Sequence, residues 1–154
     1  MLEALRRRPG TELVLFAHPR DEASAEALTR DTAGLPVRWH RQWLPSREVA
    51  RRLALECDAL VFWHDDVGHL SASGAARIGL ATGVPVITRR TPWFDDLSQV
   101  TFQADDLVDA VERVLDDTRL RDGLHEAARE HCTTHSWRRV AATHLDLWQS
   151  LESA

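Results

Sequence analysis

The segment "SASGAARIGLATGVPVI", residues 71–87, places two serines and a glycine ahead of a run of small residues with helical character. The first turn of a helix leaves backbone N–H groups without internal partners and carries the positive end of the helix dipole. Ser71 and Ser73 add hydroxyl donors, and Gly74 removes the side chain that would block a close approach. Such a helix start can hold a phosphate group. The same residues also allow a structural interpretation, in which Ser73 only caps the helix and the small residues let it pack closely on a sheet.

This helix start must be positioned by the elements around it, and the hydrophobic pattern of the chain alternates between two periods. Short apolar runs bounded by Gly, Pro or Asp predict strands at residues 12–17, 36–40, 58–63, 84–88 and 99–103. Helical periodicity predicts helices at about 1–8, 21–32, 46–56, 73–82 and 105–116. Because parallel strands require crossover connections, this alternation predicts a parallel sheet with helices on both faces.

The chain turns wholly helical after the last predicted strand. Helical patterns cover residues 119–135 and 136–153, and we expect Ser136 to cap the second of them. The apolar residues of this second segment recur at helical spacing, which predicts a single apolar stripe that lies across the domain. The stripe consists of Trp137, Val140, Ala141, Leu145, Trp148 and Leu151.

Length, charge and cysteine content limit the class of protein. A chain of 154 residues fits one domain with one core. A net charge of -5 argues against nucleic acid or an anionic membrane surface as the main partner. Cys57 and Cys132 form no C-x-x-C pair, and no stretch resembles a signal peptide or reaches the ~20 apolar residues of a membrane span. We therefore expect one cytoplasmic domain, residues 1–154, with no membrane span.

Ligands of open parallel sheets bind beyond the carboxyl ends of the strands, where loops lead into helices. Four stretches follow predicted strands in this way: "HPRDE" (18–22), "RQWLPS" (41–46), "HDDVGHLSASG" (64–74) and "RRTPWFDDL" (89–97). Only the third is long. Because a long crossover loop adds no core, it more often serves a ligand than the fold.

Five stretches, in order along the chain, resemble the carboxyl-terminal domain of group 1 retaining glycosyltransferases of the GT-B fold. They are "LEALRRRPGTELVLFAH" (2–18), "LPVRWHRQWLPSREVARRLALECDALVFW" (35–63), "SASGAARIGLATGVPVITRRTPWFDDL" (71–97), "DDLVDAVERVLDDTRLRDGLHEAAREH" (105–131) and "SWRRVAATHLDLWQSL" (136–151). The last three carry most of the specificity. The resemblance implies an α/β fold, namely a Rossmann-like three-layer α/β/α domain with a mainly parallel sheet of about five strands and a helical C-terminal tail.

In that family this half of the enzyme binds the nucleotide-sugar donor, and a separate amino-terminal half holds the acceptor. By this likeness the helix start would hold the diphosphate of a UDP- or GDP-linked sugar, with no metal and no other cofactor. The residues so assigned are Ser71, Ser73, Gly74 and Ala75. Gln42, Trp43 and Leu44 would line the nucleobase pocket, which His18 would flank.

The chain also departs from the family pattern. The strand and glycine-containing loop that usually open this domain and supply Arg and Lys to the diphosphate are missing, as is the acceptor domain. Arg89 and Arg90 would then complement the phosphate charge; the alternative is that each is solvated or paired with an acidic residue at the surface. The two family glutamates fall on Leu70 and Ile78, and Asp66 or its neighbour Asp65 would contact a sugar hydroxyl.

Three functions remain open on the sequence. The first is the donor-binding half of a retaining glycosyltransferase, which needs an acceptor-binding domain or partner subunit. The second is a catalytically silent descendant that acts as a binding or scaffold module and self-associates as a homodimer. The third is an unrelated nucleotide-handling α/β domain. A metal site formed by His64, Asp65, Asp66 and His69 is a further alternative for the long loop.

Overall fold

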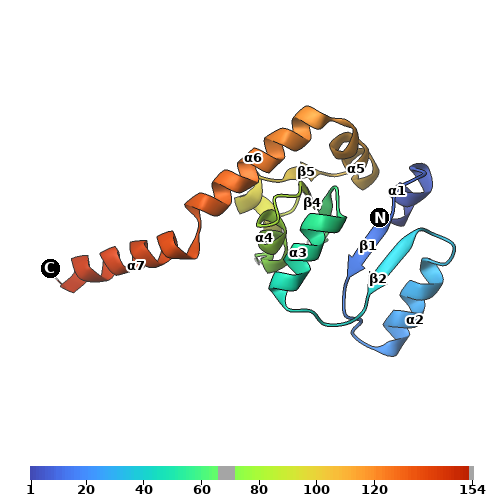
Figure 1. The fold of residues 1–154 in the computed structure, drawn as a ribbon, viewed down its shortest axis with the longest axis horizontal. Coiled ribbons are helices and arrows are strands. Elements are labelled where there is room, and N and C mark those ends of the chain that lie inside the picture. The colour runs from blue at the N-terminus through green and yellow to red at the C-terminus, as the bar shows by residue number, and fades with distance from the viewer. Residues whose placement is uncertain (66–71, 153–154) are drawn as a thin grey trace.

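A computed structural model of the protein describes residues 1–65 and 72–152, in which strands and helices alternate (Figure 1). The strands are β1 (Leu13–Phe16), β2 (Val37–His40), β3 (Leu60–Phe62), β4 (Val86–Arg89) and β5 (Phe102–Ala104). The helices are α1 (Leu2–Arg7), α2 (Glu22–Asp31), α3 (Ser46–Glu56), α4 (Gly74–Leu80), α5 (Leu107–Asp116), α6 (Thr118–Thr134) and α7 (Trp137–Glu152). Every predicted element is confirmed, with its ends moved by a few residues. A 3-10 helix, η1 (Pro92–Leu97), was not predicted.

The strands are parallel, as the alternation of strands and helices predicts. β1 pairs with β2 in the register Leu13 to Val37. β4 pairs with β3 on one edge and with β5 on the other. The prediction of one sheet of about five strands is wrong for the described residues, because the strands form two separate sheets of two and three strands. β1 and β3, which would have to join these sheets, are not paired with each other.

The three-stranded sheet lies between two helical layers. Successive residues of a strand point to opposite faces, and β4 shows this clearly. Val86 belongs to a core cluster with residues of α4, α6 and η1, whereas Ile87 belongs to a second cluster formed mainly by α5. Their side chains are 1% and 0% exposed, respectively. The helix-on-both-faces arrangement that the sequence predicts is therefore confirmed for this sheet.

The small residues of α4 allow it to lie close to β3. A Cβ atom added at Gly79 would come within 2.9 Å of the Phe62 ring and 3.2 Å of a Leu60 methyl group. Gly79 and Ala76 are both buried. The structural interpretation of the small-residue run is thus correct for the middle of the helix.

Helix α1 is attached to α5 by packing and by a paired charge. Ala4 and Leu5 are buried, and the Arg8 guanidinium donates two hydrogen bonds to Asp116, at 2.8 and 2.5 Å. The hydrogen bond from Arg8 is the main cause that holds the pKa of Asp116 below its ordinary value. A lowered carboxylate pKa means that the pair stabilises the fold above the ordinary pKa of Asp and is lost as the pH falls through the lowered value.

We expect Asp116→Asn to loosen α1 while leaving the three-stranded sheet intact, because Arg8 loses its charged acceptor but the core is untouched. At pH 7 the amides of the α1 residues should exchange faster with solvent, with no change in β4. Glu3→Gln, which removes only the two ion pairs of Glu3 with Arg6 and Arg7 within α1, serves as the control. Equal α1 exchange rates in Asp116→Asn and the unmodified protein would contradict this role.

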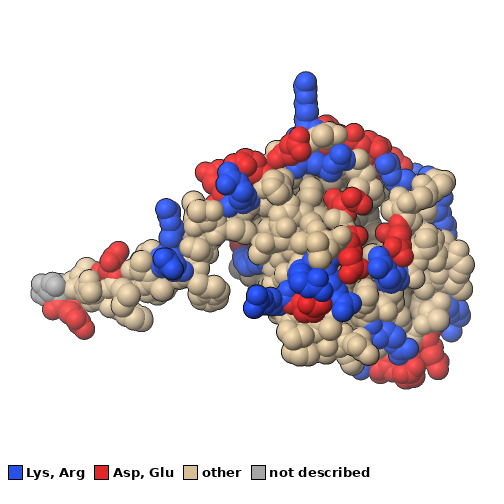
Figure 2. Space-filling view, viewed as in Figure 1, with Lys and Arg blue, Asp and Glu red and all other residues tan. Residues whose placement is uncertain are grey.

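Helix α7 extends away from the rest of the molecule (Figure 1). None of its residues is buried, and Trp137, Leu145, Trp148 and Leu151 are all more than half exposed. Figure 2 shows few charged side chains on the visible face of this arm. The predicted apolar stripe is therefore present, but the expectation that it lies across the domain is wrong. Helical periodicity identifies the apolar face of a helix without identifying what covers it.

The described helices include none that is both long enough and apolar enough to cross a membrane.

Candidate functional site

The first turn of α4 lies where β3 leads into the helical layer. Ser73 is its N-cap and is 6% exposed, and its hydroxyl oxygen accepts a hydrogen bond of 3.2 Å from the Ala76 amide. Gly74 faces open space, because a Cβ atom built on it would meet nothing within 4 Å. Ser73 is thus engaged as a cap, whereas the backbone at Gly74 remains open to a close approach. Ser71 lies outside the described residues.

The loops after β1 and β2 meet around a small pocket of about 120 Å³. Its lining includes four residues that the sequence assigns to the donor site: His18 from the first loop, and Gln42, Trp43 and Leu44 from the second. The Trp39 indole N–H donates to the Ala17 carbonyl at 2.8 Å, which ties the two loops together. The Trp43 side chain is 77% exposed and therefore accessible to a flat ring. His18 Nδ1 lies 2.9 Å from the Pro19 carbonyl oxygen, which favours the tautomer with the proton on Nδ1.

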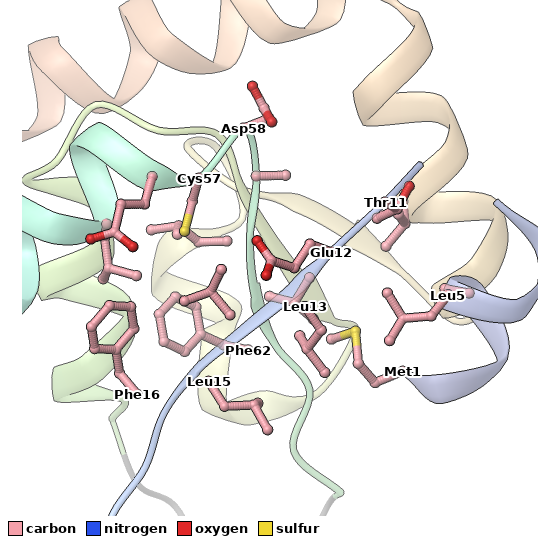
Figure 3. Close-up of a pocket in the computed structure, with 18 of the residues that line it drawn as sticks. Met1, Leu5, Thr11, Glu12, Leu13, Leu15, Phe16, Cys57, Asp58 and Phe62 are labelled. Carbon is pink, nitrogen blue, oxygen red and sulfur yellow. The ribbon is translucent and has the colours of Figure 1, made fainter. Parts of the chain in front are cut away.

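A second, larger pocket of about 960 Å³ adjoins the first, since Phe16, Ala17 and Val49 line both. It lies between β1 and β3, as Figure 3 shows. Ala75, from the first turn of α4, and His64, which follows β3, contribute to its lining. The structure therefore brings His18, Gln42, Trp43, Leu44 and Ala75 around two adjoining pockets, although these residues lie up to 57 positions apart in the sequence.

Arg89 is placed differently. It ends β4, lines neither pocket and forms an ion pair with Asp65. Arg77, one turn into α4, donates to the Ser73 carbonyl at 3.1 Å and pairs with Asp96. Both guanidinium groups therefore have carboxylate partners already. Asp66, assigned to the sugar, lies outside the described residues.

Two histidines occupy positions whose packing the sequence did not predict. The His64 ring lies 5.5 Å from that of Trp93 and 5.6 Å from that of Phe94. His40 ends β2 and stacks on Phe16, with a centroid distance of 4.5 Å. Its Nε2 atom is buried without a hydrogen-bond partner among the described residues. The position of His40 at a strand end was a usable signal, but its stacking on Phe16 depends on the pairing of β1 with β2.

The larger pocket contains a half-buried cysteine. Cys57 lines the larger pocket, and burial is the main cause that raises the pKa of its thiol, which keeps it protonated and a poor nucleophile. Within residues 1–65 and 72–152, no three His, Cys, Asp or Glu side chains are grouped so that they could hold a metal ion. The alternative metal site of the long loop includes Asp66 and His69, which are not described.

No protein-family model matches this chain, and no curated protein matches it at a significant level.

Proposed function

We propose that this chain is the nucleotide-sugar-binding half of a retaining glycosyltransferase and that an acceptor-binding domain or partner subunit completes it. In this proposal the two small sheets belong to a Rossmann-like domain of the GT-B type. The observation that carries the proposal is the meeting of the loops after β1 and β2 around a pocket that adjoins a second pocket, which Ala75 of α4 lines although Ser73 and Gly74 do not. Ligands of parallel sheets bind at this edge.

The proposed donor lies with its base near Trp43 and its diphosphate near Gly74. The exposed indole supplies a surface on which a nucleobase can stack. Gly74 lets a phosphate come close to the helix start, where backbone N–H groups favour negative charge. As the glycosidic bond breaks, negative charge grows on the leaving diphosphate, and the same groups would stabilise it. No side chain of this half then has to act as a covalent nucleophile.

A second candidate, a catalytically silent binding or scaffold module, is favoured by the pairing of charges. The Ser73 hydroxyl caps its own helix, and Arg77 and Arg89 are held by Asp96 and Asp65. A diphosphate would have to displace these carboxylates or rely on backbone groups alone. The exposed apolar stripe of α7 also suits a protein whose role is to bind another polypeptide.

Calorimetric titration and thermal unfolding with UDP, GDP, UDP-glucose and GDP-mannose separate the two candidates. We expect one nucleotide family to stabilise the chain, by about 2.7 kcal/mol when its concentration is 100 times Kd. Gly74→Leu should weaken this binding at least tenfold, because the added side chain fills the open space that the phosphate requires. Its fold should persist, since a Cβ atom at this position meets no neighbour.

Gly123→Leu is the matched control, because Gly123 lies in α6 and is equally free of neighbours. It should bind nucleotides as the unmodified chain does. The absence of any response to millimolar nucleotide would contradict donor binding and support the silent module. Binding that is unchanged in Gly74→Leu would show that the phosphate lies elsewhere.

A further inference from the structure

The exposed helix α7 carries a line of residues with the spacing of a coiled-coil seam. Their spacing alternates between four and three, which keeps them on one side of the helix over its whole length. The seam consists of Trp137, Ala141, His144, Trp148 and Leu151. Every Trp, Leu and Val side chain of α7 is at least 36% exposed. A seam of this kind is completed by a second helix.

The charges at the two ends of α7 oppose the dipole of the helix. Arg138 and Arg139 lie in its first turn, and Glu152 is its last residue. A helix dipole favours anions at the N-terminal end and cations at the C-terminal end. Helices α1, α2 and α5 follow this rule, with an acidic residue in the first turn and a basic residue in the last. The reversed charges of α7 would be favourable only with opposite charge beside each end of the helix.

An antiparallel second copy of α7 supplies that opposite charge. Arg138 and Glu152 are two seven-residue repeats apart, so they flank the seam on the same side. A two-fold axis perpendicular to two antiparallel helices brings the same side of each helix together, with the first turn of one beside the last turn of the other. Arg138 of each copy then lies near Glu152 of the other. In a parallel pair Arg138 would instead face the opposite side of the seam, which carries Val140 and Leu147.

The shape of the molecule favours the same orientation. Helix α7 projects from the end of α6, and its C-terminal end points away from the sheets and the other helices (Figure 1). In an antiparallel pair the two folded bodies lie at opposite ends of the paired helices, so neither body obstructs the other. A parallel pair would place both bodies at the same end, where they would compete for space.

We propose that α7 pairs with α7 of a second copy of this chain in antiparallel orientation, and that reciprocal contacts between Arg138 and Glu152 set this orientation. The interface is isologous, so each contact occurs twice. His144 lies midway between Trp137 and Leu151 and therefore meets its own counterpart at the two-fold axis. A polar residue in an apolar seam fixes the register of the two helices. The inference names the contact face and orientation of a homodimer and depends on neither candidate function.

Sedimentation equilibrium of the full chain tests the pairing. The average mass should rise from that of one chain to that of two across the micromolar range, since two short helices bury less area than a typical stable dimer. Arg138→Glu and Glu152→Arg should each weaken association about fivefold, because each places like charges together twice. Mixing these two variants should restore association. Arg139→Glu and Asp146→Arg are the matched controls, because they make the same changes of charge on the face opposite the seam.

Disulfide cross-linking measures the orientation. His144→Cys should cross-link to its counterpart, whereas Leu151→Cys should not, because its two copies lie about 21 Å apart in the antiparallel pair. The unmodified chain, with its free Cys57 and Cys132, gives the background rate. Equal cross-linking of the two variants, or equal effects of the charge variants and their controls, would overturn the proposal. A chain that stays monomeric at millimolar concentration would also overturn it: slow amide exchange in α7 would then mean that its own domain covers the stripe, and fast exchange that a different polypeptide does.

Discussion

Replacing Phe94 by alanine is expected to lower the free energy of unfolding by about 3–5 kcal/mol, the cost typical of removing a fully buried aromatic ring. The Phe94 side chain is 0% exposed and is the largest of the fully buried side chains. It packs in the core cluster with Leu80 and Val86, so its removal leaves a cavity between η1, α4 and β4. It also lies 5.6 Å from the His64 ring, which would lose its support beside the larger pocket.

Thermal and urea-induced unfolding measure this effect. The midpoint of thermal unfolding should fall by on the order of 10 °C for a domain of this size. Trp43→Ala is the control, because it removes another aromatic side chain, one that is 77% exposed, and should change stability by no more than about 0.5 kcal/mol. Similar losses in the two variants would mean that Phe94 is not part of the core.

Gly79→Leu is expected to destabilise the protein by about 1–3 kcal/mol, the range for overpacking a core. A Cβ atom at Gly79 already comes within 2.9 Å of the Phe62 ring, and the remaining leucine atoms extend further toward β3. The Phe62 ring lines the pocket between β1 and β3 and could turn into it. Helix α4 would otherwise move outward and carry Ser73 and Gly74 with it.

Gly74→Leu on the same helix separates this effect from a change in helix propensity. Both variants replace glycine by leucine in α4, but only Gly79 has neighbours within 4 Å. Gly74→Leu should unfold at the same temperature as the unmodified chain or slightly above it, because glycine is a poor helix former. If Gly79→Leu were equally stable, α4 and β3 would be less closely packed than described.

The sequence predicted the elements well because their signals are local. The run "ELVLFA" predicts the strand at Leu13–Phe16, and the pattern "SREVARRLALE" predicts the helix at Ser46–Glu56. Both predictions depend only on residues that are neighbours in the sequence. The arrangement of the strands in sheets is not local. Whether β1 lies beside β3 depends on what fills the space between them. The hydrophobic periodicity of the two strands does not indicate which segment this is. The same reason applies to α7. Its apolar face was predicted correctly from local spacing, whereas the prediction that this face packs on the domain was wrong.

The candidate site divides in the same way. The rule that ligands bind at the carboxyl edge of parallel strands selected the loops of His18 and Trp43, and these loops do meet. An acid-paired Arg89 was one of the interpretations that the sequence allowed, but its partner Asp65 was not identified, because the pair joins the end of β4 to the loop after β3. The stacking of His40 on Phe16 likewise requires the register of β1 against β2. Residue type and spacing identified the candidate residues, whereas packing determines which ion-pair and stacking partners they have.

The exposed helix α7 has an energetic consequence for any encounter with another molecule. At 1.5 Å per residue its sixteen residues extend about 24 Å, and helices of this length without tertiary support are only marginally wound in water. If another molecule covered Trp148 and Leu151, the burial of these side chains would therefore also stabilise the helical conformation of the segment. Binding of a partner to α7 and formation of the helix would then be coupled, and the entropy of ordering the segment would lower the binding affinity. A gain in the helical circular dichroism signal on binding would report this coupling.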